Sequence, residues 1–167
     1  FQTQEGLADR LLYEKMRGED SEFAPYIDVL PSSFDLPRFW SASTIAQAPR
    51  RIQNALEEDA KRLLFADEWA QACVDTRFHV LPDGRYALTP VLDMINHRNH
   101  VVTRSSVVDD VLDLRIVTPP SSWMDALPWQ APSEVFISYN ENMTNIDTML
   151  QYGFVDVENP SNTEVLK

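Results

Sequence analysis

A group of polar side chains at residues 93–100 is the first candidate for chemistry in this 167-residue chain. Residues 88–100, LTPVLDMINHRNH, begin with an apolar run that predicts a buried strand. A carboxylate and two imidazoles at this spacing could bind a metal ion. The same side chains could instead bond to loop backbone at a strand end, as most buried polar groups do. Both interpretations stay open for Asp93, Asn96, His97, Asn99 and His100.

The sequence lacks the patterns of serine hydrolases, nucleotide-binding proteins and thiolate zinc sites. No Gly-x-Ser-x-Gly turn presents a serine, and 4 glycines leave no nucleotide-binding glycine fingerprint. Cys73 is the only cysteine, which excludes an internal disulfide and zinc sites made of clustered thiolates. We expect Cys73 to be a small core residue. The third histidine, His79, falls in a predicted strand, so we predict no metal site.

The charge of the chain bears on its partners. With 26 acidic and 14 basic residues, the formal net charge is -12. Nucleic acids demand clustered Lys and Arg, so we expect no nucleic acid as partner. A basic peptide or protein segment is the more natural partner for this charge, and the alternative that the acidic residues serve only to keep the chain soluble stays open. No stretch approaches the roughly 20 apolar residues of a membrane helix, so no membrane span is expected. A single cysteine fits a reducing compartment, and chloroplast stroma, cytoplasm and nucleus stay open.

The first half of the chain is predicted to be helical. Leucines at helical spacing predict a helix over residues 3–17, which Gly18 ends. Residues 21–41 are rich in Pro and aromatics and predict a capped turn followed by a packed connector. An amphipathic pattern over residues 52–64 predicts another helix, which we expect to continue through residues 67–78.

The second half is predicted to consist of short strands. Runs rich in β-branched and aromatic residues lie within 77–81, 86–95, 101–108, 111–118 and 134–139. A Pro-rich loop over residues 119–133 interrupts them, and residues 145–154 predict one or two helical turns before Gly153. Helices followed by many short strands indicate an α+β fold.

Two motifs in this half, taken in order, carry a resemblance to a known family. The first is LTPVLDMINH, with Pro90, Asp93, Asn96 and His97; the second is EVFISYNENMTNIDTMLQYGF, with residues 135–139, Asn145 and Tyr152-Gly153-Phe154. Together they resemble the SET-domain protein methyltransferases, in the branch of the plastid Rubisco large-subunit lysine methyltransferase. Upstream, LLYEKMRGEDSEFAPYIDVLP and DTRFHV look like further segments of this branch. The resemblance covers residues 7–160.

The resemblance implies a SET domain: short strands in small sheets, with a knot-like C-terminal segment beside the Asn-His segment. Residues 1–76 would be mostly a helical insertion in the N-terminal half of this domain, and residues 77–167 its C-terminal core. The family's Gly-x-Gly part would lie upstream and its substrate-binding domain downstream. We therefore expect a partial chain.

The implied activity is transfer of a methyl group from S-adenosylmethionine to a lysine of a protein substrate. Asp93 would brace the Asn-His turn. The resemblance assigns cofactor binding to Arg77, Asn96, His97 and Tyr152, catalysis to Tyr139 and Tyr152, and substrate binding to Arg77, Tyr139 and Phe154. Tyr152 would position the amine rather than act as a base, because a tyrosine with a pKa near 10 is a poor base at neutral pH.

Two departures from the family pattern keep a second hypothesis open. The glycine-containing turn before the second motif is replaced by a segment with Pro132, and Arg98 follows the Asn-His pair. The chain could thus be a catalytically degenerate SET-like domain that serves as a structural or interaction subunit of a larger assembly. Lysine and histidine both stay open as the methyl acceptor.

Overall fold

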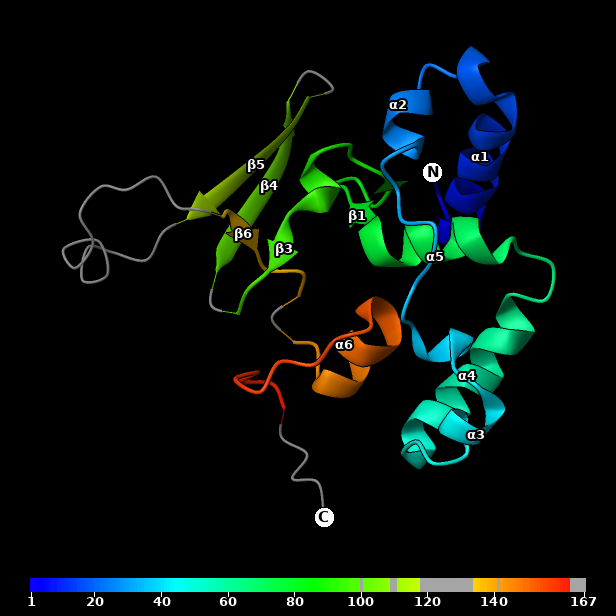
Figure 1. Cartoon of the computed structure of the whole chain (residues 1–167). Helices are drawn as coiled ribbons and strands as arrows, with labels where there is room; N and C mark the ends of the chain where they lie inside the picture. The colour runs from blue at the N-terminus through cyan, green and yellow to red at the C-terminus, as the bar shows by residue number, and fades with distance from the viewer. Residues whose placement is uncertain (100, 109–110, 118–133, 141, 163–167) are drawn as a thin grey trace.

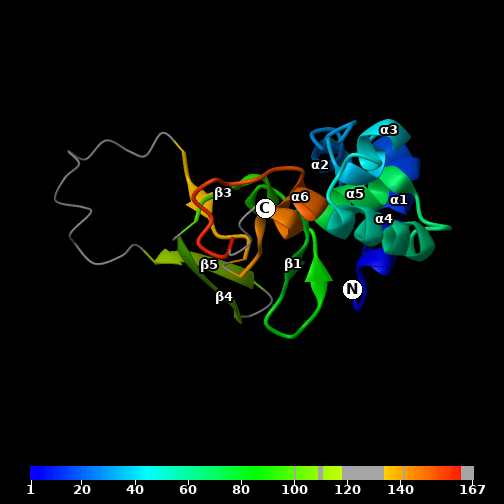
Figure 2. The same cartoon turned by 90° about the horizontal axis from the view of Figure 1, so that it is seen from below.

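The computed structural model describes residues 1–99, 101–108, 111–117, 134–140 and 142–162. Helices gather at one end of the molecule and short strands at the other, which confirms the predicted α+β fold (Figures 1 and 2). The helices are α1 (Gln4–Arg17), α2 (Ala24–Ile27), α3 (Ala42–Ile45), α4 (Arg50–Arg62), α5 (Glu68–Arg77) and α6 (Asn145–Tyr152), with 3-10 helices η1 (Gly18–Asp20), η2 (Pro37–Phe39) and η3 (Leu92–Met94). The strands are β1 (His79–Val80), β2 (Tyr86–Ala87), β3 (Asn96–His97), β4 (Val102–Val108), β5 (Val111–Val117) and β6 (Phe136–Ile137).

The helical end is built on the packing of α1 against α5. The hydroxyl of Thr3 accepts the backbone N–H of Gly6 at the start of α1, and Gly18 ends the helix with a φ of 56°, as the sequence predicts. Cys73 is fully buried between these helices, in agreement with its predicted core position. The core cluster consists of Leu7, Ala8, Leu11, Ile27, Leu30, Ala70, Cys73 and Val74.

The helix predicted to run on past residue 64 is in fact two helices. α4 ends at Arg62, and the side chain of Asp67 accepts the backbone N–H of Ala70 to begin α5. Such a cap satisfies one of the free N–H groups of a new helix and so favours a break just before it. Leu64 and Phe65 in the break are 70% and 96% exposed, so no apolar face holds the two helices in line.

The strand predicted over residues 86–95 is also wrong for most of its length. Only β2 is extended, and it pairs antiparallel with β1. Val91 then adopts a φ of 77°, is 80% exposed and precedes η3. Pro90 has no backbone N–H to give to a sheet, and a positive φ turns the chain away from a strand path. The polar residues that follow therefore leave a tight turn rather than a buried strand.

Two small sheets complete the strand end. β4 and β5 confirm the strands predicted within 101–108 and 111–118 and pair as an antiparallel hairpin, whereas residues 134–139 contain only the two residues of β6. β6 pairs in parallel with β3, so that Asn96 lies opposite Phe136 and His97 opposite Ile137. This short pairing joins the two motifs that the sequence analysis singled out.

α6 ends with Tyr152, one of the residues that the resemblance assigns to catalysis. Thr144 and Asp147 form a capping box at its start, and Gly153 ends it in the left-handed region with a φ of 79°. The helix predicted before Gly153 is thus confirmed. The predicted loop at 119–133 and His100 lie outside the described residues.

The predicted division of the domain between residues 76 and 77 stays a prediction. The knot-like threading of the C-terminal segment also stays a prediction. Among the described helices, none is both long and apolar enough to cross a bilayer.

Candidate active site

Four aromatic side chains from distant parts of the chain meet where β3, β6 and the end of α6 come together. The ring centroids of Tyr139 and Tyr152 are 4.7 Å apart, and those of His97 and Tyr139 are 5.2 Å apart. Phe154 lies 5.8 Å from His97 and 6.0 Å from Tyr152 by the same measure. These spacings are typical of packed aromatic pairs. We call His97, Tyr139, Tyr152 and Phe154 the aromatic cluster.

The imidazole of His97 is held by the protein at both nitrogens. Its Nδ1 accepts the backbone N–H of Tyr139 at 3.1 Å, and its Nε2 lies 3.1 Å from Oδ1 of Asn99. Because Nδ1 must accept, Nε2 carries the proton and donates to Asn99. Neither nitrogen is left to bind a metal ion, and the described residues contain no group of three or more His, Cys, Asp or Glu that could hold one. The ring instead fixes the backbone of Tyr139.

The two tyrosine hydroxyls have opposite hydrogen-bond roles. The Tyr139 hydroxyl donates to the carbonyl of Ile95 at 2.9 Å. The Tyr152 hydroxyl accepts from Nε2 of Gln151 at 3.1 Å, and the same nitrogen donates to the carbonyl of Asp75 at 3.0 Å. Burial raises the pKa of both phenols, and for Tyr152 the neighbouring Tyr139 raises the pKa further. Both tyrosines are therefore neutral hydroxyls at physiological pH.

A half-buried arginine, Arg77, and a buried aspartate, Asp93, lie beside this cluster. Arg77, the last residue of α5, donates from Nη1 to the hydroxyl of Thr76 at 2.8 Å. Asp93 accepts the hydroxyl of Tyr26 at its Oδ2. Burial raises the pKa of the Asp93 carboxyl, while the hydrogen bond from Tyr26 and the charge of Arg77 oppose the rise. The sequence-based expectation of a bracing role for Asp93 is compatible with this contact but leaves one carboxylate oxygen unexplained.

Three buried polar atoms at this place have no hydrogen-bond partner among the residues that the structure describes. They are Nε of Arg77, Oδ1 of Asp93 and Oγ of Ser138. Buried polar groups without partners are costly and uncommon in native proteins. Arg77, Asp93 and Ser138 all line one cavity, where a ligand or an ordered water would complete the bonding.

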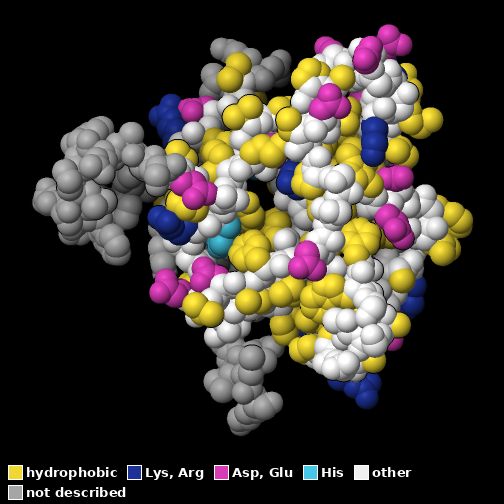
Figure 3. Space-filling model, in the orientation of Figure 1, with side chains coloured by type: hydrophobic (Ala, Val, Ile, Leu, Met, Phe, Trp, Pro, Cys, Tyr) yellow, Lys and Arg dark blue, Asp and Glu magenta, His cyan; other side chains and the backbone are white. Residues whose placement is uncertain are grey.

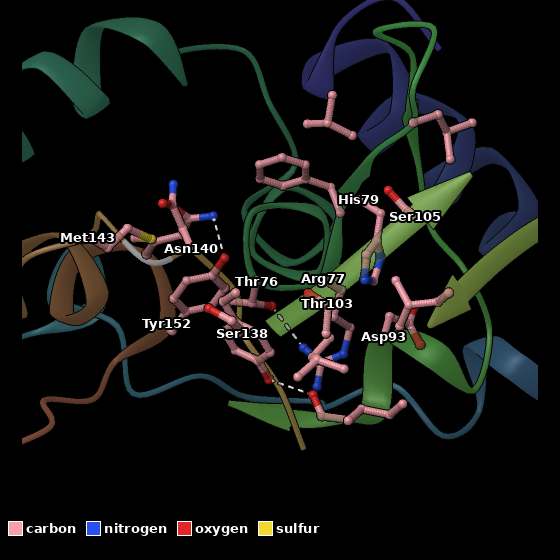
Figure 4. A pocket seen from close by; sticks show the side chains of 18 of the residues that line it. Thr76, Arg77, His79, Asp93, Thr103, Ser105, Ser138, Asn140, Met143 and Tyr152 are labelled. Atoms are coloured by element: carbon pink, nitrogen blue, oxygen red, sulfur yellow. Dashed lines mark hydrogen bonds between the residues drawn. The ribbon is translucent and has the colours of Figure 1, made fainter. Parts of the chain in front are cut away.

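Two cavities open on either side of these residues. The first, of about 490 Å³, lies between residues 31–35 and the Asn-His segment, and we call it the Asn96 cavity. The second, of about 370 Å³, lies between the end of α5, β1 and the β4–β5 hairpin, and we call it the hairpin cavity (Figure 4). The surface is hollowed between the strand end and the helical end of the molecule (Figure 3). Both cavities are lined by Thr76, Arg77, Asp93, Tyr139 and Tyr152, which we call the shared wall.

The structure brings all six predicted site residues to this place, divided between the two cavities. Arg77, Tyr139 and Tyr152 belong to the shared wall. Asn96, His97 and Phe154 line the Asn96 cavity but not the hairpin cavity. Phe154, predicted to bind substrate, thus lies with the residues predicted to bind the cofactor. The side chain of Asn96 is exposed and donates to Oε1 of Glu134 at 2.6 Å.

Sequence reasoning missed three residues at the site. Gln151 and Ser138 stand next to predicted tyrosines in the sequence, but nothing in their types or spacing marked them. Tyr26 lies in the upstream segment that carried part of the resemblance, and its role became visible only through its contact with Asp93.

Comparisons with known proteins agree on one fold. No protein-family model matches the chain. SET domain-containing protein 4 of Homo sapiens is 26% identical over 187 residues, covering 90% of this chain and 41% of its own length. The chloroplastic Rubisco large-subunit N-methyltransferase of Nicotiana tabacum is 27% identical, with 87% and 35% covered. The actin-histidine N-methyltransferase of Drosophila melanogaster is 26% identical, with 97% and 37% covered. The chain thus spans well under half the length of these relatives.

Solved structures give the same result. The SET domain of LSMT bound to lysine and AdoHcy superposes with a TM-score of 0.65 at 23% identity, over 87% of this chain and 40% of that chain. Rubisco LSMT bound to AdoMet superposes with a TM-score of 0.64 at 20% identity, over 91% and 40%. The fold of this chain is therefore that of a SET domain, related to that of the Rubisco large-subunit methyltransferase.

Proposed function

We propose that the chain is the part of an S-adenosylmethionine-dependent protein N-methyltransferase that contains the methyl-transfer site, with a lysine side chain as acceptor. The observation that supports this proposal is the shared wall, because it lets two ligands approach the same buried residues from separate cavities. Methyl transfer needs such an arrangement, in which donor and acceptor meet in line while each enters by its own route. Relatives named as N-methyltransferases support the same activity.

The Asn96 cavity fits the cofactor. Its wall offers aromatic faces from His97, Tyr139, Tyr152 and Phe154, against which a purine ring can pack. The unpartnered Nε of Arg77 and Oδ1 of Asp93 offer a donor and an acceptor at the inner end. When bound, S-adenosylmethionine supplies a methyl group on a positively charged sulfur. We therefore assign cofactor binding to Arg77, Asn96, His97 and Tyr152, and add Phe154.

The hairpin cavity fits the amine. A free lysine has a pKa of about 10.4 and must lose its proton before its lone pair can react. The guanidinium of Arg77 and the burial of the site both disfavour a charged amine there. Tyr139 and Tyr152 stay neutral and can orient the amine without removing its proton, since burial raises the pKa of both. We assign positioning of the acceptor to these two tyrosines.

We propose lysine rather than histidine as the methyl acceptor because of the substrates for which the relatives are named. Rubisco large-subunit and aldolase methyltransferases are among the relatives, and the second is named as a lysine methyltransferase. The relative named for histidine has a similar identity, so histidine is the second acceptor to test. Label transfer to peptides with a central lysine or a central histidine would separate the two.

The first test is calorimetric titration of S-adenosylmethionine and S-adenosylhomocysteine into the longest natural form of the protein. Micromolar dissociation constants, about -8 kcal/mol, are expected. Asn96→Ala should weaken binding, and Glu134→Ala is its matched control because it removes the same hydrogen bond but keeps the Asn96 amide. Equal losses in both variants would reduce Asn96 to a structural role. No binding to the folded wild-type protein would favour the non-catalytic hypothesis, in which the SET fold serves a larger assembly.

A further inference from the structure

The β4–β5 hairpin has two chemically different faces. On one face, Arg104 lies opposite Arg115 and Ser106 opposite Asp113. The side chains of Arg104 and Arg115 are exposed, and Arg115 forms an ion pair with Asp113 at 2.8 Å. Successive side chains of a strand point to opposite faces, so the residues between these belong to the other face. Among the described residues of β4 and β5, the charged side chains thus all belong to the face turned away from the hairpin cavity.

The face that lines the hairpin cavity is uncharged. Thr103 and Ser105 of β4 and Leu112 and Leu114 of β5 form it, with Ser105 directly opposite Leu114. Figure 4 shows Thr103 and Ser105 beside His79, across the cavity from Tyr152.

The other described residues that line the hairpin cavity are also mostly uncharged. Leu81, Ile95, Ile137 and Met143 are apolar, and burial lowers the pKa of His79, which keeps its imidazole neutral. Arg77 and Asp93 are the only charged residues among the described lining residues, and both belong to the shared wall at its inner end. A side chain beside the target amine would therefore meet leucines and hydroxyls.

We propose that this enzyme selects target lysines whose immediate neighbours are aliphatic or small uncharged residues, rather than lysines within basic or acidic runs. The inference rests on the proposed function. A charged neighbour placed against Leu112 and Leu114 would lose its hydration without gaining a partner, which is costly. The net charge of -12 can attract basic proteins from a distance, but it does not act through this wall. The basic partner expected from composition stays a prediction about the whole partner protein, whereas this proposal concerns only the residues beside the target lysine.

The test uses two peptide libraries with a central lysine, one flanked by Val, Leu, Gly and Ser, the other by Lys, Arg, Asp and Glu. Methyl-label transfer by the longest natural form should be at least about tenfold faster on the uncharged library. Fluorescence polarisation with S-adenosylhomocysteine present should show the same order of peptide affinity. Equal or reversed preference would overturn the inference while leaving the methyltransferase proposal intact.

Leu114→Asp tests the wall itself. It should lower transfer to the uncharged library about tenfold and raise transfer to peptides flanked by Lys or Arg. Ser106→Asp adds the same charge on the opposite face of the same hairpin and should leave both rates within about a factor of two. If both variants have the same effect, the hairpin face does not select the substrate. No transfer to either library by a protein that binds the cofactor would overturn lysine transfer and this inference together.

Discussion

At the scale of single residues, the two site tyrosines differ in what their protons can do. The hydroxyl proton of Tyr139 is committed to the carbonyl of Ile95. Tyr152 uses a lone pair to accept from Gln151, and no described residue accepts its proton. A phenol oxygen has two acceptor positions and one donor, so Tyr152 keeps one of each for a ligand. In the proposed reaction, Tyr152 is therefore the hydroxyl that is free to form a hydrogen bond with the amine, whereas the hydroxyl of Tyr139 is held in place.

Gln151→Met tests whether this hydroxyl must be aligned. Methionine keeps the length of the side chain but cannot donate to Tyr152 or to the Asp75 carbonyl. We expect the maximal rate of methyl transfer to fall about tenfold, less than in Tyr152→Phe, with cofactor affinity within about a factor of two. The ¹³Cζ resonance of Tyr152 should also move.

Gln53→Met is the matched control, because Gln53 donates to the carbonyl of Ala48 away from the site. It should leave both the rate and the Tyr152 resonance unchanged. An unmoved Tyr152 resonance in Gln151→Met would show that the hydrogen bond does not exist in solution.

Tyr26→Phe tests the electrostatics of Asp93. The hydrogen bond from Tyr26 lowers the pKa of the Asp93 carboxyl against the effect of burial. Removing the hydroxyl should raise this pKa further, so Asp93 ionises at higher pH and less of it is charged at any given acidic pH. Carbon NMR of the Asp93 carboxyl across pH measures the midpoint. Tyr13→Phe, at a 54% exposed tyrosine, should leave the midpoint where it is.

The site residues that the sequence predicted were those with a motif around them. Asn96 and His97, and Tyr152 with Phe154, were found because two ordered motifs resembled one family. Gln151 was not predicted, because it donates one hydrogen bond to the Tyr152 hydroxyl and another across to the carbonyl of Asp75 in α5. Such a contact depends on how the helices pack, which no local pattern encodes.

At the scale of elements, Gly153 fixes where Tyr152 and Phe154 point. Its φ of 79° reverses the chain after α6, and a Cβ at this position would collide with the backbone carbonyl of Asp35. Only glycine adopts this conformation at little cost and also permits the close approach. The connector at residues 31–35, which lines the Asn96 cavity, therefore packs directly on the turn that carries the aromatic cluster.

Gly153→Ala should destabilise the protein by about 3 kcal/mol, from the strained backbone together with overpacking. Gly84→Ala is the control, since Gly84 has a similar φ of 82° but no atoms within 4 Å of the added Cβ. Gly84→Ala should lower the free energy of unfolding by only about 1 kcal/mol. Urea unfolding of both variants measures the difference. Equal losses would mean that the contact with Asp35 relaxes freely.

Elements with a strong period or a clear cap were predictable, and those governed by a single residue were not. α1 followed from its leucines between Thr3 and Gly18. The apolar residues at 86–95 satisfied a strand pattern, yet Pro90 and the positive φ of Val91 replaced the strand with a turn. The cap at Asp67 likewise divided a helix whose amphipathic pattern continued past the break.

At the scale of the whole molecule, Asp75 joins four parts of the chain. Its carboxylate, 5% exposed as a residue, accepts from Arg38 at 2.6 Å and from Gln71 at 2.7 Å. Arg62 of α4 reaches the same carboxylate at 3.4 Å. The Asp75 carbonyl accepts from Gln151. η2, α4, α5 and α6 thus converge on one residue just before the shared wall.

Asp75→Asn should lower the free energy of unfolding by about 3–5 kcal/mol, because it leaves the charge of Arg38 buried without its carboxylate partner. Glu58→Gln is the control, because its ion pair with Lys61 is exposed to water and adds little to stability. Urea unfolding measures both. A loss in Asp75→Asn no larger than in Glu58→Gln would show that the network adds nothing to stability.

The parallel pairing of β3 with β6 also decides when the site can exist during folding. Its partners are separated along the chain by the whole β4–β5 hairpin and the segment after it, so the ends of a long loop must meet before the pair forms. Contacts between distant segments slow folding, whereas the backbone hydrogen bonds within each helix and across the β4–β5 hairpin join near neighbours in the chain. A newly made chain should therefore gain most of its helix and hairpin before it gains any aromatic cluster. Partly folded molecules would look nearly native by circular dichroism and yet bind no cofactor.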